Sequence, residues 1–276
     1  MMPTSKRVYP ADRKPAKGLS YLLLFLSAVV ILSGLAGRGL DAPVIQAVPT
    51  PSPIPLLDAF DETPEEREVS LTGAVWYALQ LGAFEDEAAA KELAERFRLR
   101  GAAGYLWQDG RYRVLAAIYP SKEDAQNVRR QLLAQHAIET FLYEVSLPAL
   151  TLRVNGMKGQ IDVLEAAFLH ANELILGLQE LSVRLDRQEA NAAEARERLL
   201  ALAGQTDLVA LRLEQRFPAP REQTIQGLIA LFRTYRAFCD GQDATQSAVT
   251  CGRDIKHQAI QCLRLYRGVV EAMRTT

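Results

Sequence analysis

The hydrophobic positions between residues 75 and 145 alternate in short runs and then change to a spacing of three and four residues, twice in succession. Alternation is typical of half-buried strands, and the longer spacing is typical of helices with one apolar face. The pattern predicts four strands and two helices, at Val75–Leu81, Asp86–Arg100, Ala103–Gln108, Arg111–Ala117, Ser121–Gln135 and Ile138–Val145. Ser121 is a suitable helix N-cap, and Gly101 is a suitable C-terminal stop.

This region contains a repeat with an offset of 35 residues. The segment Tyr77–Phe84 aligns with Tyr112–Tyr119, and the hydrophobic positions of the two helices also coincide. Two strand–helix–strand units in a row predict an α+β domain of βαββαβ order, with both helices on one face of an antiparallel sheet, as in ferredoxin-like and RNA-recognition folds. In that order the first and third strands lie at the centre.

Strand alternation assigns the side chains to two faces of the predicted sheet. Asp109-Gly110 predicts a two-residue hairpin, which pairs Leu106 with Arg113. The residues expected to face the helices are Tyr77, Leu79, Leu81, Val114 and Ala116, and those expected on the open face are Trp76, Ala78, Gln80, Leu106, Arg113 and Leu115. The faces of Phe141 and Tyr143 depend on one residue of register and stay undecided.

The doubled segment resembles the SPOR (sporulation-related repeat) domain of bacterial envelope proteins, over about residues 75–149. The first half carries Leu79-Gln80-Leu81-Gly82-Ala83-Phe84, similar to the family's Val-Gln-x-Gly-x-Phe pattern. The second half runs from Tyr112-Arg113-Val114 to Ala117, where the family more often has glycine, and on into a helix that contains Ala125. The resemblance implies binding to peptidoglycan, in particular to glycan strands whose stem peptides have been removed at division or sporulation septa.

Five residues of the expected open face are candidates for glycan binding. A denuded strand exposes the lactyl carboxylate of each muramic acid, with which Arg113 can pair. Gln80 can hydrogen-bond acetamido or hydroxyl groups, and Trp76 can stack on a sugar ring. Leu115 and Leu106 add apolar surface. The alternative interpretation is that Arg113 only solvates the sheet and that Trp76 caps the core.

Residues 154–276 carry helical stripes. The first runs from Ile161 to Leu185 at steps of three and four, and two more run through Ile225–Cys239 and Ile255–Met273. The spacing predicts a long helix and a helical hairpin, and it is compatible with a helical bundle or with a self-associating coiled coil. The role that we expect for this tail is contact with a protein partner or with a second copy of the chain.

The N-terminal part predicts a membrane tether. Residues 1–18 carry five Lys and Arg against one Asp, and residues 19–36 contain no charge. Eighteen helical residues span roughly 27 Å, enough to cross a bilayer core, and the basic side stays in the cytoplasm. A cleavable secretory signal is the alternative, and both place the rest outside the cytoplasm. The Pro-rich, acidic residues 37–73 predict an extended linker.

The charge balance, the cysteines and the absence of catalytic motifs exclude several classes of function. The 32 basic and 33 acidic residues give no overall basic excess for nucleic-acid binding. Cys239, Cys251 and Cys262 permit one disulfide, for which Cys239–Cys251 is favoured; the alternative is that Cys239 and Cys262 are buried apolar residues. The spacing of the cysteines and His257 is not that of a zinc site. We expect no metal, no cofactor and no catalytic residues, since no nucleophile, metalloprotease or P-loop motif occurs.

The sequence therefore predicts a non-enzymatic, membrane-tethered envelope protein that binds septal glycan. Two alternatives stay open: a scaffold whose sheet binds a protein rather than glycan, and a targeting subunit for a wall hydrolase.

Overall fold

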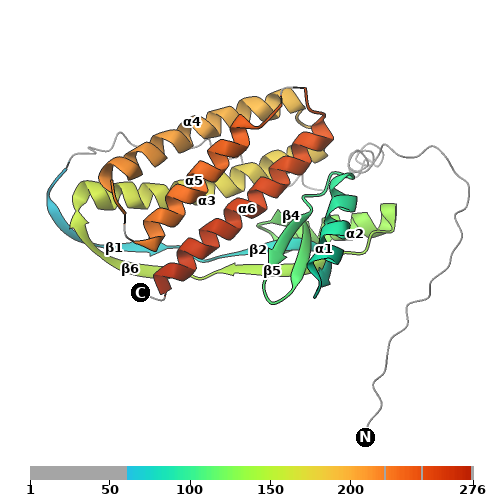
Figure 1. Ribbon diagram of the computed structural model, residues 1–276, viewed down its shortest axis with the longest axis horizontal. Coiled ribbons are helices and arrows are strands. Elements are labelled where there is room, and N and C mark those ends of the chain that lie inside the picture. Colours follow the sequence, from blue (N-terminus) through green and yellow to red (C-terminus); the bar gives the residue numbers. More distant parts are fainter. Residues whose placement is uncertain (1–60, 221, 244, 275–276) are drawn as a thin grey trace, which may run out of the picture.

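The computed structural model describes residues 61–220, 222–243 and 245–274 (Figure 1). The predicted membrane span at residues 19–36 and most of the predicted linker lie outside these residues. Strands β2 (Ala74–Phe84) and β4 (Tyr112–Tyr119) form the centre of an antiparallel sheet of order β3-β4-β2-β5, as expected. Strands β3 (Tyr105–Gln108) and β5 (Phe141–Leu147) form its edges.

Helices α1 (Glu87–Arg98) and α2 (Lys122–His136) cover one face of this sheet. Asp86 caps α1 by accepting a hydrogen bond from the Ala89 amide, and Ser121 caps α2 in the same way from the Asp124 amide. Side chains from both helices pack on Leu79 and its neighbours in β2. The predicted α+β arrangement of this domain is therefore confirmed.

The hairpin between β3 and β4 differs from the prediction by one residue. Its loop has three residues, since Gln108 pairs with Tyr112, and only Gly110 of the Asp109-Gly110 pair has a positive φ, of 82°. Leu106 therefore pairs with Val114, and Trp107 pairs with Arg113. A shift of one residue reverses every side chain of a strand, so Leu106 lies on the α1 face, and its expected place on the opposite face is wrong.

Two further strands lengthen the sheet into a ribbon. β1 (Pro64–Leu71) pairs antiparallel with β6 (Leu150–Met157), and the two strands continue β2 and β5 away from the sheet (Figure 1). A Cβ on Gly73 would lie 2.8 Å from the Ala149 amide nitrogen, so this close approach of the two chains requires glycine. The end of the predicted linker and the start of the predicted helical region are thus β-structure.

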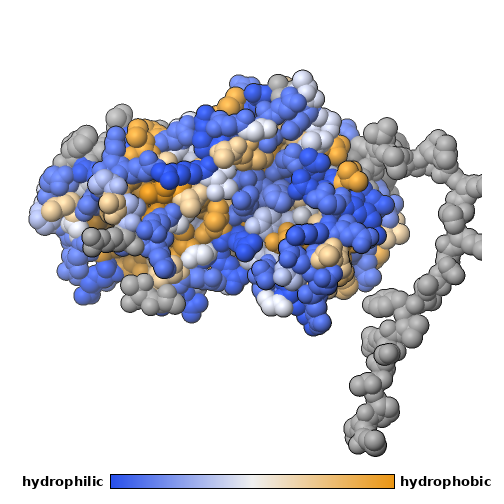
Figure 2. Space-filling view, viewed as in Figure 1, coloured by the Kyte–Doolittle hydropathy of each residue, from blue (hydrophilic) through white to orange (hydrophobic). Residues whose placement is uncertain are grey.

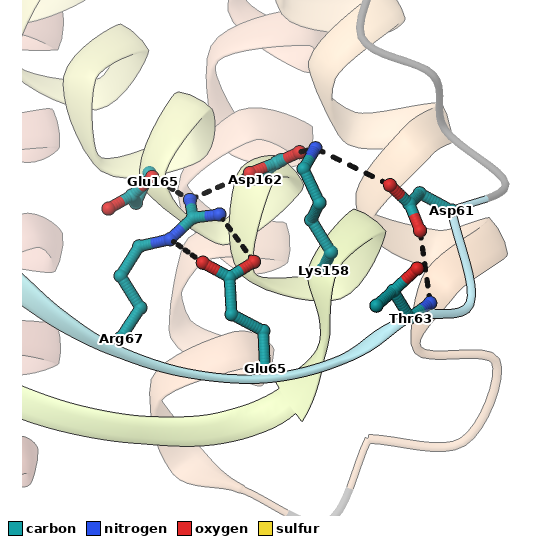
Figure 3. Close-up of polar contacts among 7 residues, drawn as sticks. All are labelled: Asp61, Thr63, Glu65, Arg67, Lys158, Asp162 and Glu165. Carbon is teal, nitrogen blue, oxygen red and sulfur yellow. Dashed lines mark hydrogen bonds and ion pairs between the residues drawn. The ribbon is translucent and has the colours of Figure 1, made fainter.

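An ion-pair cluster fastens the ribbon to the first turns of the next helix, α3 (Lys158–Asp186) (Figure 3). The Arg67 guanidinium contacts Glu65, Asp162 and Glu165 at 2.7–2.8 Å. Lys158 contacts Asp162 at 2.8 Å, and the Asp162 side chain is only 9% exposed. The two basic groups lower the pKa of Asp162 in opposition to its burial, so its carboxylate stays charged.

Four antiparallel helices follow the ribbon: α3 (Lys158–Asp186), α4 (Ala192–Arg216), α5 (Gln223–Asp240) and α6 (Ala248–Arg274). Asn191 begins α4 by accepting hydrogen bonds from the Ala193 and Glu194 amides, so α4 is a separate helix that follows the predicted stripe ending at Leu185. The three predicted stripes lie in the bundle core, which confirms the interpretation as a bundle. Cys239, Cys251 and Cys262 are buried free thiols, so the favoured disulfide is wrong.

The bundle also covers much of the second face of the sheet. Trp76, Ala78 and Leu115 belong to the same buried cluster as side chains of α3 and α6. On α6, the Lys256 ammonium donates to the Gly101 carbonyl and to Asp186, and the His257 ring contacts the Ala103 carbonyl at 3.1 Å. The expectation that this whole face is open is therefore wrong.

Candidate functional site

The five sequence-predicted site residues do not come together. Trp76 and Leu115 lie on the expected face but are buried beneath the bundle, with exposures of 2% and 0%. Leu106 lies on the opposite face. Gln80 lies farther along β2 than Trp76, Arg113 lies near the start of β4, and both are partly exposed. Only these two predicted residues can therefore reach a ligand in this arrangement.

Gln80 and Arg113 form the centre of a small polar surface, which we call the β2–β4 strip. The Arg113 guanidinium donates from Nη1 to the Gln80 side-chain oxygen at 2.9 Å and from Nε to Asp109 at 2.8 Å. These two bonds hold the guanidinium plane against the sheet. The Arg113 side chain is still 24% exposed, so its outer edge can reach solvent.

Strand β5 adds aromatic side chains to the β2–β4 strip. The Arg113 guanidinium lies 4.6 Å from the centre of the Tyr143 ring, and the Tyr143 hydroxyl donates to Asp109 at 2.6 Å. Partial burial and the bond to Asp109 raise the pKa of Tyr143, so the hydroxyl stays protonated. Phe141 pairs with Gln80 and is 49% exposed. The residues whose register was undecided thus lie on the ligand-accessible side.

Helix α6 borders the strip. Trp107, opposite Arg113 in the hairpin, meets the Tyr143 ring edge-on at 6.2 Å between ring centres. The Arg267 guanidinium of α6 lies 5.7 Å from the centre of the Trp107 ring, and its charge interacts with the Tyr143 hydroxyl. Sequence reasoning missed Trp107 because the hairpin loop is one residue longer than predicted. It missed Arg267 because no local pattern relates the tail to the sheet.

The described residues contain a further candidate, a polar cavity. A cavity of about 550 Å³ separates α2 from the end of α3 and is lined mainly by amide and charged side chains. In residues 61–220, 222–243 and 245–274, no group of three or more His, Cys, Asp or Glu side chains is arranged to hold a metal ion. The β2–β4 strip is therefore the candidate that coincides with the predicted site.

Comparison with known proteins identifies the sheet domain. Residues 75–142 match the family model of the SPOR domain, which is a binding domain. No curated protein and no solved structure gave a significant match. None of the helices among the described residues is long and apolar enough to cross a membrane. The segment from β2 to the start of β5 carries the family's motifs in the expected strands, and residues 75–142 of this chain are a SPOR domain.

Proposed function

We propose that this protein is a membrane-anchored envelope protein that binds the glycan strands of peptidoglycan through the β2–β4 strip, at sites where stem peptides have been removed during division or sporulation. A SPOR domain implies peptidoglycan binding. The observation that carries the more specific proposal is the Gln80–Arg113 pair, which is held in a fixed geometry and partly exposed on the sheet.

The chemistry of the strip suits a denuded strand. Removal of the stem peptide uncovers a carboxylate on each muramic acid, and a guanidinium binds such a group with charge-assisted hydrogen bonds. Two of the three Arg113 nitrogens are occupied by Gln80 and Asp109, and within the part of the chain that the structure describes Nη2 makes no hydrogen bond. Nη2 is the group that we assign to the carboxylate. Tyr143 and Phe141 provide ring surface for the apolar faces of sugars.

Residues 1–63 provide the tether in this proposal. The uncharged residues 19–36 anchor the chain, the basic residues 1–18 stay in the cytoplasm, and the folded part lies outside the membrane. With β1 beginning at Pro64, the spacer comprises residues 37–63. A Pro-rich chain of that length reaches roughly 80 Å at about 3 Å per residue.

The test is co-sedimentation of the full chain, in detergent, with sacculi that have or have not been treated with an amidase. We expect preferential pelleting with treated sacculi, and a loss of at least tenfold in affinity for the Gln80→Ala, Arg113→Ala double variant. Arg129→Ala is the matched control for charge, because Arg129 is exposed on α2 on the other side of the sheet. Equal binding by the parent and the double variant would exclude the strip as the site.

A second candidate function, a scaffold or a targeting subunit for a wall hydrolase, is favoured by two observations. The bundle covers part of the sheet face that was expected to bind glycan. Exposed leucines also occur on the outer sides of α3 and α4, at Leu169, Leu176, Leu200, Leu208 and Leu211. Figure 2 shows hydrophobic side chains gathered over the bundle where α4 and α5 meet. Failure of the parent chain to pellet with either kind of sacculus would support this candidate.

A further inference from the structure

We propose that the helical region completes the glycan-binding site, with Arg267 of α6 acting as a second cation for a carboxylate-bearing glycan. This inference rests on the proposed function, because it concerns the same ligand. It assigns to the C-terminal helix a direct part in recognition, in addition to its packing on the sheet.

Arg267 lies beside the same group of aromatic rings as Arg113. The Arg113 guanidinium lies on the Tyr143 ring, and the Arg267 guanidinium lies on the Trp107 ring. The two rings contact each other edge to face. Two cations from distant parts of the sequence therefore border one aromatic pair, in which Trp107 is buried beside α6 and Tyr143 is partly exposed.

The two arginines are held in the same way. The Arg113 Nε donates to Asp109 at 2.8 Å, and the Arg267 Nε donates to Glu271 at 2.6 Å. The Arg267 side chain is 31% exposed, comparable to Arg113 at 24%. A carboxylate that binds Nε fixes the guanidinium plane, and an oriented guanidinium loses less entropy when it binds a ligand.

Helix α6 is fixed relative to the sheet. Lys256 and His257 bond the carbonyls of Gly101 and Ala103, next to the first residue of β3. Arg267 follows Lys256 by eleven residues, or about three helical turns and roughly 16 Å along α6. The same helix that is attached near the start of β3 therefore carries Arg267 to the end of β3, where Trp107 lies.

The ligand class follows from the charges. The two guanidinium groups are each accompanied by one carboxylate, so the surface is not a strongly basic patch and favours a ligand with separated carboxylates over a dense polyanion. A denuded glycan strand has one carboxylate on every second sugar. Chitin has the same kind of backbone but no carboxylate, and is therefore the natural control ligand.

The experiment measures binding of the full chain, in detergent, to amidase-treated sacculi and to chitin at several salt concentrations. We expect Arg267→Ala to weaken binding to the sacculi about tenfold and to reduce its salt dependence, because one charge contact is lost. Arg267→Lys should recover part of the affinity. Arg274→Ala, which removes an exposed charge from the same helix, should bind within about twofold of the parent.

Trp107 provides a direct readout. The chain has two tryptophans, so the Trp76→Phe variant reports from Trp107 alone, and glycan binding at Arg267 should change its emission. The inference is overturned if Arg267→Ala binds the sacculi like the parent, or if it loses chitin binding to the same extent. If Arg113→Ala weakens binding and Arg267→Ala does not, only this inference fails. If neither variant changes the binding of a chain that still pellets, the proposed site fails as well.

Discussion

The burial of Trp76 is the feature that most sharply separates the structure from an open sheet face. Trp76 is 2% exposed and contributes to the core shared with the bundle. A buried tryptophan covers about 150–250 Å², which at about 25 cal/mol per Å² corresponds to roughly 4–6 kcal/mol. Its Nε1 donor is buried without a partner among the described residues, which offsets about 1–3 kcal/mol of that gain. We therefore expect Trp76→Ala to destabilise the protein by about 3 kcal/mol.

Urea unfolding followed by circular dichroism measures this change. Trp76→Phe is the matched variant, since it keeps most of the apolar volume and removes the unpaired donor, and it should change the free energy of unfolding by less than about 1 kcal/mol. Glycan binding should persist in both variants, because Trp76 lies beneath the bundle. A Trp76→Ala protein that keeps its stability and loses glycan binding would show that the sheet face is open and that our reasoning is wrong.

Three further predictions concern the bundle. Burial lowers the pKa of His170 to about 4 from 6.5, so the free energy of unfolding should fall by about 3 kcal/mol as the pH drops from 6.5 to 4. Urea unfolding at several pH values should show that the His170→Leu variant lacks this dependence on pH. An equal dependence in the variant would contradict the burial of a neutral His170. Asp186→Ala leaves the Lys256 ammonium, 4% exposed, without its carboxylate, and should cost about 3–5 kcal/mol in thermal unfolding. A cost below 1 kcal/mol would mean that this pair is solvated. Burial raises the pKa of the Cys262 thiol to about 12, so the thiol should not react with iodoacetamide at pH 8 until guanidinium unfolds the chain. Mass spectrometry measures the modification. Rapid labelling of the native chain would refute the burial of Cys262.

The strands and helices of the SPOR domain could be predicted because their hydrophobic periods are local. The N-cap at Ser121 was equally local and is confirmed. The hairpin register depended on how many residues follow Gln108, and Asp109-Gly110 occurs in loops of two and of three residues. That one residue decided whether Leu106 or Trp107 shares a face with Arg113.

The covering of the sheet by the bundle depends on contacts between residues far apart in the sequence. The sequence nevertheless indicates that the second face of the sheet is buried. Trp76, Ala78 and Leu115 are apolar on the face opposite the helices, and strands that are apolar on both faces are typical of sheets buried on both sides. Only Gln80 and Arg113 interrupt that pattern, and they lie where the cover ends. The strand β1 was missed because the charged residues of Glu65–Glu68 conceal the alternation that continues to Val69 and Leu71.

The ribbon has a mechanical consequence if the chain is tethered at its N-terminal side and holds the cell wall through Gln80. β2 continues the later part of β1, which curves at its start (Figure 1), and Gly73 between them lies close to Ala149 of the returning chain. A force applied between residue 61 and Gln80 would then act on strand backbone. At roughly 3.3 Å per residue, this backbone is already near its maximum length and can lengthen little. With such a tether, tension between wall and membrane would pass through this pair of strands, and the four helices, which lie beside them, would not have to stretch to transmit it.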